Sequence, residues 1–298
     1  MKKRILFFMS DTGGGHRAAA TAIDEAIQRL YPGRFETIIA DVWQGCTPWP
    51  INQIPRAYPW LTGPGLPLWR LMWLLSYHLQ AHRLLFPLVR RLSRRRMTGY
   101  LQQIRPDLVV SVHPLMNHLG LQLVAGAGLD IPFVTVVTDL VTIHPAWIYP
   151  QVTRCLVPTE EARQQALRLG LPPAKVRVCG QPVSLKFING PANKSLLRSK
   201  LGLDAHRPAL LLLGGGEGVG PIFELAQTLA AAVPQIQLMI VAGRNQQLKK
   251  NSRPQPGAFL PTSMALSIIC PNSCAPPTCS SPRPAPAPSA RPLFPACR

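Results

Sequence analysis

The most constraining feature of this sequence is the alternation of short apolar runs with helical patterns over the first 180 residues. Five runs predict buried strands: RILFFM, ETIIADV, DLVVSVH, PFVTVVTD and RCLVPT. Residues 16–30, 115–127 and 159–170 predict helices between them. Continuous apolar strands joined by helical crossovers are typical of a parallel sheet covered on both faces. The sequence therefore predicts an α/β fold with a Rossmann-like domain over residues 1–180.

A second unit of the same kind begins near residue 205. The stretch PALLLLGGGEGVGPIFELAQTLAAAV has the pattern of a strand, a glycine loop and a helix, and QIQLMIVAGRN predicts the next strand. We expect residues 181–204 to form a linker and residues 205–250 to begin a second Rossmann-like domain. Two such units in tandem predict two domains that face a cleft, the second of them incomplete.

Residues 42–106 differ from both units, because they contain no Asp or Glu and five of the six tryptophans. Within them, residues 66–96 repeat Leu and Trp at helical spacing and end in arginines. The chain as a whole carries a net charge of +19, which predicts an anionic partner. The pattern predicts a helix in a membrane interface, whereas the alternative is a helix packed in the protein core. The residues expected at anionic membrane lipid or near a lipid acceptor are Trp60, Trp69, Trp73, Arg90, Arg91, Arg94 and Arg95.

Several classes of protein are not expected. The arginines accompany Trp and Leu rather than a polar face, which argues against nucleic-acid binding. No apolar run is long enough to predict a transmembrane helix. The seven cysteines are irregularly spaced, which favours neither a disulfide framework nor a zinc site and predicts a reducing cytoplasm.

Residues 251–298 contain 12 prolines, four of the seven cysteines and no Asp or Glu, a composition typical of a disordered tail. They follow a second domain in which only two strands are predicted. Read one base out of frame, with suitable synonymous codons, residues 270–291 become PELMRAADLLITKAGPGTISEA. That peptide has the pattern of a strand, a glycine loop and a helix start. We therefore hypothesise a one-base frameshift between about Gln247 and Met264.

Ligands bind beyond the carboxyl ends of the strands in such sheets, where FFMSDTGGGHRAAATAIDEAI places its glycine loop. Bare backbone lets a ligand approach closely, and the helix that follows offers free N–H groups. His16 falls in the first helical turn, where the dipole favours the neutral imidazole that a general base needs. The alternative is a histidine that only packs or caps. The loop matches neither a dinucleotide fingerprint nor a P-loop.

Other candidates for the cleft follow the other predicted strands. The loop GGGEGVG, Gly214–Gly220, is suited to cradle a diphosphate or to form a turn that requires glycine. Asp139 and His144 follow FVTVVTD, and His113 and Asn117 follow DLVVSV. An Asp–His pair that faces a bound hydroxyl would suit proton transfer.

Four segments together carry a specific resemblance: MSDTGGGHRAAATAIDEAI, VTDLVTIHPAW, CLVPTEEARQQALRLGLPPAKVRVCGQPV and LLLLGGGEGVGPI. They resemble the family of monogalactosyldiacylglycerol synthases and processive diacylglycerol glucosyltransferases over residues 1–248. The re-read tail also resembles the donor-binding loop of that family at KAGPGTISEA. The resemblance implies a GT-B fold, in which the first domain takes the lipid acceptor at a membrane and the second takes the UDP-sugar.

The resemblance further implies an inverting transfer of a hexose from UDP-galactose or UDP-glucose to diacylglycerol, with no metal and no cofactor. His16 is then the base on the diacylglycerol hydroxyl, and Asp139 is the second catalytic candidate. Gly14 and Gly15 would shape the loop near the sugar. The residues expected near the donor diphosphate are Gly214, Gly215, Gly216, Glu217 and Gly218. The implied location is peripheral, on the cytoplasmic face of a membrane.

Two alternatives stay open. One is transfer of N-acetylglucosamine to a lipid-linked peptidoglycan precursor, by an enzyme that also has two domains and glycine loops. The other is a basic membrane-binding remnant without catalysis. The printed chain lacks the later donor loop of the family, so we expect no transferase activity from it unless the reading frame is restored.

Overall fold

The computed structural model of the chain describes residues 2–12, 14–78, 82–188, 193–215, 218, 220–243, 245 and 246, with the backbone alone for residues 82–85. The chain divides into two compact units, Met1–Leu197 and a second unit from Arg198 on. Each unit has its own parallel sheet and its own core. The tail 251–298 and the whole span from Gln247 to Met264 that is expected to hold a frameshift lie outside the described residues.

The first unit contains a six-stranded parallel sheet in the order β2-β1-β3-β4-β5-β6. The strands are β1 Lys3–Met9, β2 Phe35–Asp41, β3 Leu108–Ser111, β4 Phe133–Val136, β5 Arg154–Val157 and β6 Val176–Val178. The first five coincide with the five predicted strands, so the predicted α/β fold with a parallel sheet is confirmed. The short edge strand β6 was not predicted.

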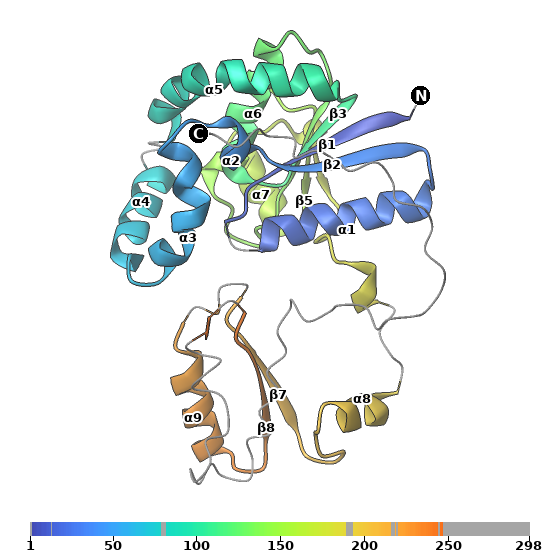
Figure 1. The fold of residues 1–298 in the computed structure, drawn as a ribbon, viewed down its shortest axis with the longest axis vertical. Coiled ribbons are helices and arrows are strands. Elements are labelled where there is room, and N and C mark those ends of the chain that lie inside the picture. Colours follow the sequence, from blue (N-terminus) through green and yellow to red (C-terminus); the bar gives the residue numbers. More distant parts are fainter. Residues whose placement is uncertain are drawn as a thin grey trace. The chain divides into compact units, whose positions relative to one another are not determined.

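Helices cover both faces of this sheet, as Figure 1 shows. Helix α1 (Gly15–Leu30) covers one face, where Phe7 packs in a core with Ala20. Helices α5 (His82–Ile104), α6 (Pro114–Gly126) and α7 (Glu160–Arg168) cover the other face, where Phe8 packs with Met116. Adjacent side chains of β1 thus enter opposite cores, which explains why the strand is apolar throughout.

The sequence determines locally where these helices begin. Thr159 caps α7 by accepting a hydrogen bond from the backbone N–H of Ala162, at 3.1 Å. Asp41 does the same for the short helix α2 (Val42–Cys46) through the N–H of Gln44, at 2.8 Å. Helix α6 begins with Pro114, whose fixed φ suits the first helical position. Helices α2, α6 and α7 therefore start within a few residues of the end of a strand, which keeps these connecting loops short at the carboxyl edge of the sheet.

The tryptophan-rich segment forms several helices rather than one. It contains the 3₁₀ turn η1 (Ile51–Gln53) and the helices α3 (Ile54–Thr62), α4 (Leu66–His78) and α5. The single helix expected over residues 66–96 is therefore α4 and part of α5, with residues 79–81 outside the described residues. None of the described helices combines the length and apolar character needed to cross a membrane.

The chain after β6 docks back onto α1 before the first unit ends. The short 3₁₀ turn η4 (Leu185–Phe187) follows Ser184, whose hydroxyl donates to Oε2 of Glu25 at 2.6 Å. The backbone N–H of Leu185 donates to the same oxygen at 3.2 Å. Residues 184 and 185 therefore belong structurally to the first unit, and the division between the units falls within α8 (Lys194–Lys200).

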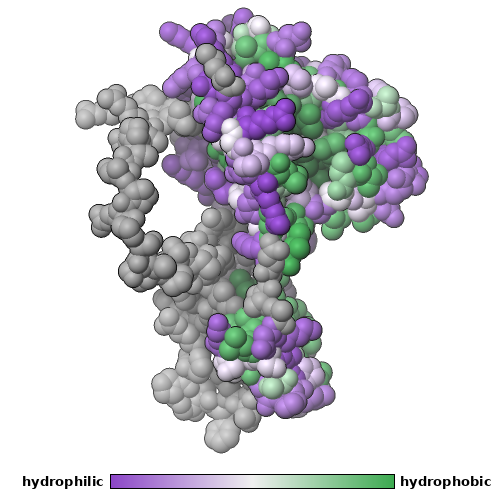
Figure 2. Space-filling view, turned by 90° about the vertical axis from the view of Figure 1, so that its right-hand side faces the viewer, coloured by the Kyte–Doolittle hydropathy of each residue, from purple (hydrophilic) through white to green (hydrophobic). Residues whose placement is uncertain are grey.

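The second unit has β7 (Ala209–Leu213), α9 (Ile222–Ala232) and β8 (Gln237–Val241), with β7 and β8 paired in parallel. This confirms the predicted order of strand, loop, helix and strand. Hydrophobic surface interrupts the hydrophilic surface of the unit in Figure 2, and exposed fractions of 39% to 60% are found for Leu210, Leu211, Leu213 and Leu225. In the described residues of this unit, a two-stranded sheet with one helix leaves apolar strand residues uncovered.

Candidate active site

The candidate site lies where the strand order of the first unit reverses. β1 has β2 on one side and β3 on the other, so the connections that leave these strands diverge at the carboxyl ends of β1 and β3. Ligands of open α/β sheets bind in the crevice at such a point. The loop after β1 carries His16, and the residues after β3 and β4 include His113 and Asp139. The structure therefore brings these three predicted residues to one edge of the sheet.

His16 is held in one tautomer by the end of β3. Its Nδ1 lies 2.7 Å from the carbonyl oxygen of Val112, and because a carbonyl only accepts, Nδ1 carries the proton and donates. Nε2 of the neutral ring then has a free lone pair. Burial lowers the pKa of His16 below its ordinary 6.5, whereas the bond to Val112 and the charge of Asp139 oppose this shift. His16 is thus a neutral imidazole at neutral pH with Nε2 able to accept a proton.

His113 packs edge-on against His16, with ring centroids 4.5 Å apart. It is 4% exposed, and its Nε2 lies 3.0 Å from the hydroxyl of Thr12. Its Nδ1 is buried without a hydrogen-bond partner. Burial, followed by the proximity of His16, holds the pKa of His113 well below its ordinary 6.5. The pair therefore disfavours a proton on either ring.

Asp139 is oriented by the indole of Trp147 rather than by a histidine ring. Its Oδ2 accepts from Nε1 of Trp147 at 2.8 Å and from the backbone N–H of His144 at 3.3 Å. The ring of Trp147 lies 6.2 Å from the ring of His16, centroid to centroid. Among the described residues no hydrogen bond joins Asp139 to His16, and the charge of Asp139 raises the pKa of the His16 ring.

Asn117 and His144 have structural partners. Asn117 is fully buried, donates to the carbonyl of Trp147 at 3.1 Å and accepts from the hydroxyl of Thr135 at 3.1 Å. His144 is 4% exposed, and its Nδ1 accepts from the N–H of Ala146 to cap the turn η2 (Pro145–Trp147). Both residues therefore hold the turn that contains Trp147 in place, and this turn forms one wall of the site.

A column of rings leads from the tryptophan-rich helices to this wall. Trp69 lies 5.4 Å from Tyr58 and 6.2 Å from Trp73, and Trp73 lies 4.6 Å from His144, all between ring centroids. Helix α4, which carries both tryptophans, has no buried residue. Trp60 and Trp73 are 54% and 44% exposed. The described part of α5 exposes the four predicted arginines, Arg90, Arg91, Arg94 and Arg95.

Gly14 and Gly15, the described glycines of the first loop, are not required there by the backbone. A Cβ added to Gly14 or Gly15 would meet no atom within 4 Å, and neither residue has a positive φ. Gly14 is the N-cap of α1, with no side-chain cap of its own. The space beside these two residues is therefore open, as close approach by a ligand requires.

The glycines of the second loop do have a conformational role. Gly215 and Gly218 have φ values of +67° and +63°, and a Cβ on Gly218 would lie 2.0 Å from the carbonyl oxygen of Ala242. Nδ2 of Asn245 donates to the carbonyl of Gly218 at 2.9 Å. Gly214 directly follows β7, whereas Gly216 and Glu217 lie outside the described residues. The described part of this loop is a turn that needs glycine, packed on the end of β8.

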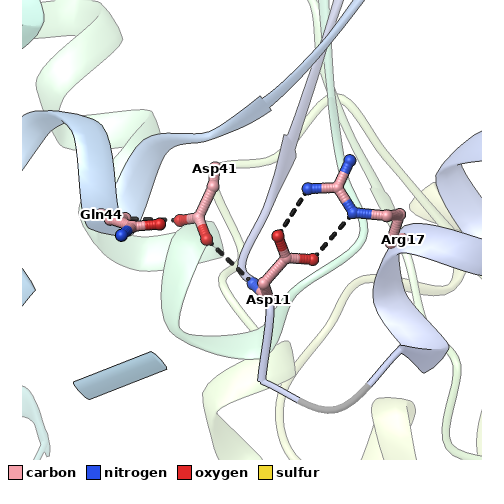
Figure 3. Close-up of polar contacts among 4 residues, drawn as sticks. All are labelled: Asp11, Arg17, Asp41 and Gln44. Carbon is pink, nitrogen blue, oxygen red and sulfur yellow. Dashed lines mark hydrogen bonds and ion pairs between the residues drawn. The ribbon is translucent and has the colours of Figure 1, made fainter. Parts of the chain in front are cut away.

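Arg17, Asp41 and Trp147 lie near the site and were not identified from the sequence, whereas Asp11 falls in the polar stretch from Ser10 to His16 that follows the first predicted strand. Asp11, Arg17 and Asp41 form a polar network beside the first loop, drawn in Figure 3, and Trp147 orients Asp139. Asp41 ends β2 and was open to the argument applied to the other strand ends. Trp147 is 1% exposed and has the pattern of an ordinary core aromatic residue. Among the described residues, no group of three His, Cys, Asp or Glu side chains is arranged to hold a metal.

Comparisons with solved structures identify the class of fold. A Listeria monocytogenes protein designated a UDP-N-acetylglucosamine 2-epimerase is 14% identical, covers 90% of this chain and 69% of its own, and superposes with a TM-score of 0.51. MnaA of S. aureus, in a co-structure with UDP, is also 14% identical, with 91% and 69% covered and a TM-score of 0.50. The chain has the GT-B type of α/β fold, which confirms the predicted class.

The sequence comparisons identify the family. The sequence model of monogalactosyldiacylglycerol (MGDG) synthase matches residues 16–183. The chloroplastic MGDG synthase of Spinacia oleracea is 42% identical over 255 residues, and MGDG synthase 1 of Arabidopsis thaliana is 40% identical over 256 residues. Each match covers 83% of this chain and 49% or 48% of the relative. The chain belongs to the MGDG synthase family, and it spans about half the length of these relatives.

Proposed function

We propose that this protein transfers a hexose from a UDP-sugar to the free hydroxyl of 1,2-diacylglycerol at a membrane surface. The observation that carries the proposal is the tautomer of His16. Its Nδ1–H is bonded to Val112, so that the Nε2 lone pair is available at the switch point of the sheet. A general base needs this state, and burial keeps the ring neutral.

In the proposed reaction, Nε2 of His16 accepts the proton of the acceptor hydroxyl while its oxygen attacks the anomeric carbon of the sugar. The bond between that carbon and the diphosphate oxygen breaks, and UDP leaves with the electron pair. Attack opposite the leaving group inverts the anomeric configuration. Asp139, whose charge favours the protonated ring, stabilises the imidazolium as it forms.

We propose UDP-galactose as the donor, because the relatives are named monogalactosyldiacylglycerol synthases. UDP-glucose is the second candidate. The open space beside Gly14 and Gly15 suits the sugar, and the second glycine loop is the candidate for the diphosphate. Helix N-termini at both loops offset phosphate charge, which supports the prediction that no metal or cofactor is needed.

We propose that α4 and α5 rest on the membrane and deliver the lipid. The apolar side chains of α4 include Leu68, Leu71 and Leu74, each 47% to 53% exposed. The ring column from Trp69 through Trp73 to His144 leads from this helix to the wall of the site. We propose peripheral association, with the cytoplasmic face as the sequence suggested, although the relatives carry the word chloroplastic in their names.

The test is a transfer assay on vesicles that contain diacylglycerol and phosphatidylglycerol, with radiolabelled UDP-galactose or UDP-glucose. The printed chain and a frame-restored chain are compared. We expect glycolipid from the frame-restored chain, with UDP-galactose preferred, and none from the printed chain. Transfer of N-acetylglucosamine to a peptidoglycan lipid precursor, but not of a hexose to diacylglycerol, would contradict the proposal. Vesicle binding by the frame-restored chain without turnover would favour a non-catalytic membrane protein.

A further inference from the structure

The first glycine loop is closed at its base by an ion pair. Both carboxylate oxygens of Asp11 accept from Arg17, from Nε at 2.8 Å and from Nη2 at 2.5 Å. The two residues stand on either side of the loop that contains Gly14, Gly15 and His16. A bidentate arginine–carboxylate pair fixes the relative orientation of its partners in a way that a single contact does not.

Asp11 is itself fixed to the end of β2. Its backbone N–H donates to Oδ2 of Asp41 at 3.0 Å, while Oδ1 of Asp41 accepts from the N–H of Gln44 at 2.8 Å. Figure 3 shows the resulting chain of contacts from Gln44 through Asp41 and Asp11 to Arg17. The first turn of α1 is therefore connected to the neighbouring strand across the carboxyl edge of the sheet.

Neither the helix dipole nor a gain in stability explains the presence of the ion pair between Arg17 and Asp11. Arg17 places a cation in the first turn of α1, where the dipole disfavours positive charge, and this turn contains no acidic residue. The side chains of Arg17 and Asp11 are 50% and 42% exposed, so the pair adds little to stability in water. The pair instead fixes the relative positions of the two ends of the loop that carries His16, because it joins them directly.

We propose that Asp11 and Arg17 are positioning residues, a clamp that closes the glycine loop and holds the ring of His16 with Nδ1 on Val112. The purpose of the clamp rests on the proposed function, because the group that it orients, His16, is the proposed general base. His16 precedes Arg17 directly, so a shift of the first helical turn moves the imidazole away from the Val112 carbonyl. A further contact of the loop, between the hydroxyl of Thr12 and Nε2 of His113, holds the neighbouring ring.

The test measures the tautomer of His16 by ¹⁵N NMR on the full printed chain with labelled histidine, above the pKa of the ring. The signals of His16 are assigned with His16→Gln. We expect the Nδ1–H form in the unmodified chain. In Asp11→Ala and Arg17→Ala its population should fall at least twofold, and the double variant should change no further than either single one. Arg17→Lys keeps the charge but loses the fork, and should behave like Arg17→Ala.

The matched control is Glu36→Ala. It breaks the ion pair of Glu36 with Arg4, whose side chains are similarly exposed at 49% and 41% in the same sheet. We expect the His16 tautomer to stay unchanged in this variant. An unchanged tautomer in Arg17→Lys and Arg17→Ala, with the signals of His113 intact as evidence of folding, would overturn the clamp.

The kinetic arm uses the frame-restored chain. The clamp predicts that Arg17→Lys lowers kcat at least tenfold while KM for the UDP-sugar changes less than twofold. A change in KM with kcat preserved would contradict the clamp and make Arg17 a donor contact. Because the tautomer measurement needs no turnover, failure of the frame-restored chain to transfer sugar would overturn the proposed function separately.

Discussion

Each of the two units of this molecule contains a strand followed by a glycine loop and a helix, but the two loops are built differently. In the first, Gly14 and Gly15 adjoin open space and have ordinary backbone angles. In the second, Gly218 has a positive φ and no room for a side chain. Glycine therefore leaves space for a ligand in the first loop and makes the turn possible in the second.

The surroundings of the two loops differ as well. Ionisable side chains gather at the first loop, where His16, His113 and Asp11 have defined partners. The second loop contains one ionisable residue, Glu217, which lies outside the described residues. The exposed arginines of α5 and the helix α4, which has no buried residue, also belong to the first unit. The repeated motif of strand, glycine loop and helix thus indicates where a ligand can bind. The residues at the ends of the neighbouring strands determine which chemistry is available there.

The largest expected effect concerns the membrane surface assigned to the first unit. Replacing the arginines of α5 by alanine should weaken binding to anionic vesicles by about 1 kcal/mol per charge, or up to about 4 kcal/mol for Arg90, Arg91, Arg94 and Arg95 together. Flotation with phosphatidylglycerol vesicles measures this, and neutral vesicles should show no change. A control with the same loss of charge replaces Lys2, Lys3, Arg29 and Arg34. An equal loss of binding in the control would mean that net charge, and not this surface, sets the affinity.

Next in size is the substitution Gly218→Ala in the second unit. The new Cβ would collide with the carbonyl oxygen of Ala242, and the positive φ of Gly218 is one that alanine rarely adopts. We therefore expect the β7–β8 unit to lose about 2–4 kcal/mol of stability. Hydrogen exchange of the amides of β7 and β8 measures the loss. Unchanged protection would show that this loop does not need glycine, and the contrast between the two loops would break down.

A smaller effect is expected from pH in the first unit. The folded pKa values of His16 and His113 lie below the ordinary 6.5, so the unfolded chain binds more protons as pH falls below 6.5. Stability present above that pH is lost on acidification, by up to about 1.4 kcal/mol per pH unit for each histidine. Urea unfolding between pH 7.5 and 5.5 should show this slope, and His113→Gln should reduce it.

The smallest change in stability is expected for Gly15→Ala. Nothing lies within 4 Å of the added methyl group, and alanine is the better helix former, so the first unit should keep or gain up to about 1 kcal/mol. Turnover of the frame-restored chain should nevertheless fall, because the methyl group enters the space assigned to the sugar. Full turnover in this variant would mean that the open space is not used by a substrate.

The strands and helices of the first unit could largely be predicted from the sequence, because β1 to β5 are apolar runs and α1, α6 and α7 follow them directly. β6 was missed because it is a three-residue edge strand with Arg177 in its middle. The segment 66–96 was expected as one helix because its Leu and Trp spacing does not reveal where one helix ends and another begins. The GT-B class and the family were predicted correctly from ordered motifs.

The candidate site was only partly accessible from the sequence. His16, His113 and Asp139 follow neighbouring strands, so the rule about strand ends brings them together. The tautomer of His16 was not accessible, since it depends on a carbonyl 96 residues away. The contacts of Asp11 with Arg17 and Asp41 likewise depend on the register of β1 and β2. The roles of the predicted donor, acceptor and catalytic residues stay predictions.

Single-turnover transfer to diacylglycerol by the frame-restored chain, with and without His16→Gln, tests the central claim most directly. The loss of a general base should slow the chemical step by roughly 10²–10⁴-fold, while binding of UDP measured by calorimetry stays the same. His118→Gln, which changes a histidine stacked on Tyr149 away from the loop, should retain the full rate. An unchanged rate in His16→Gln would contradict the account.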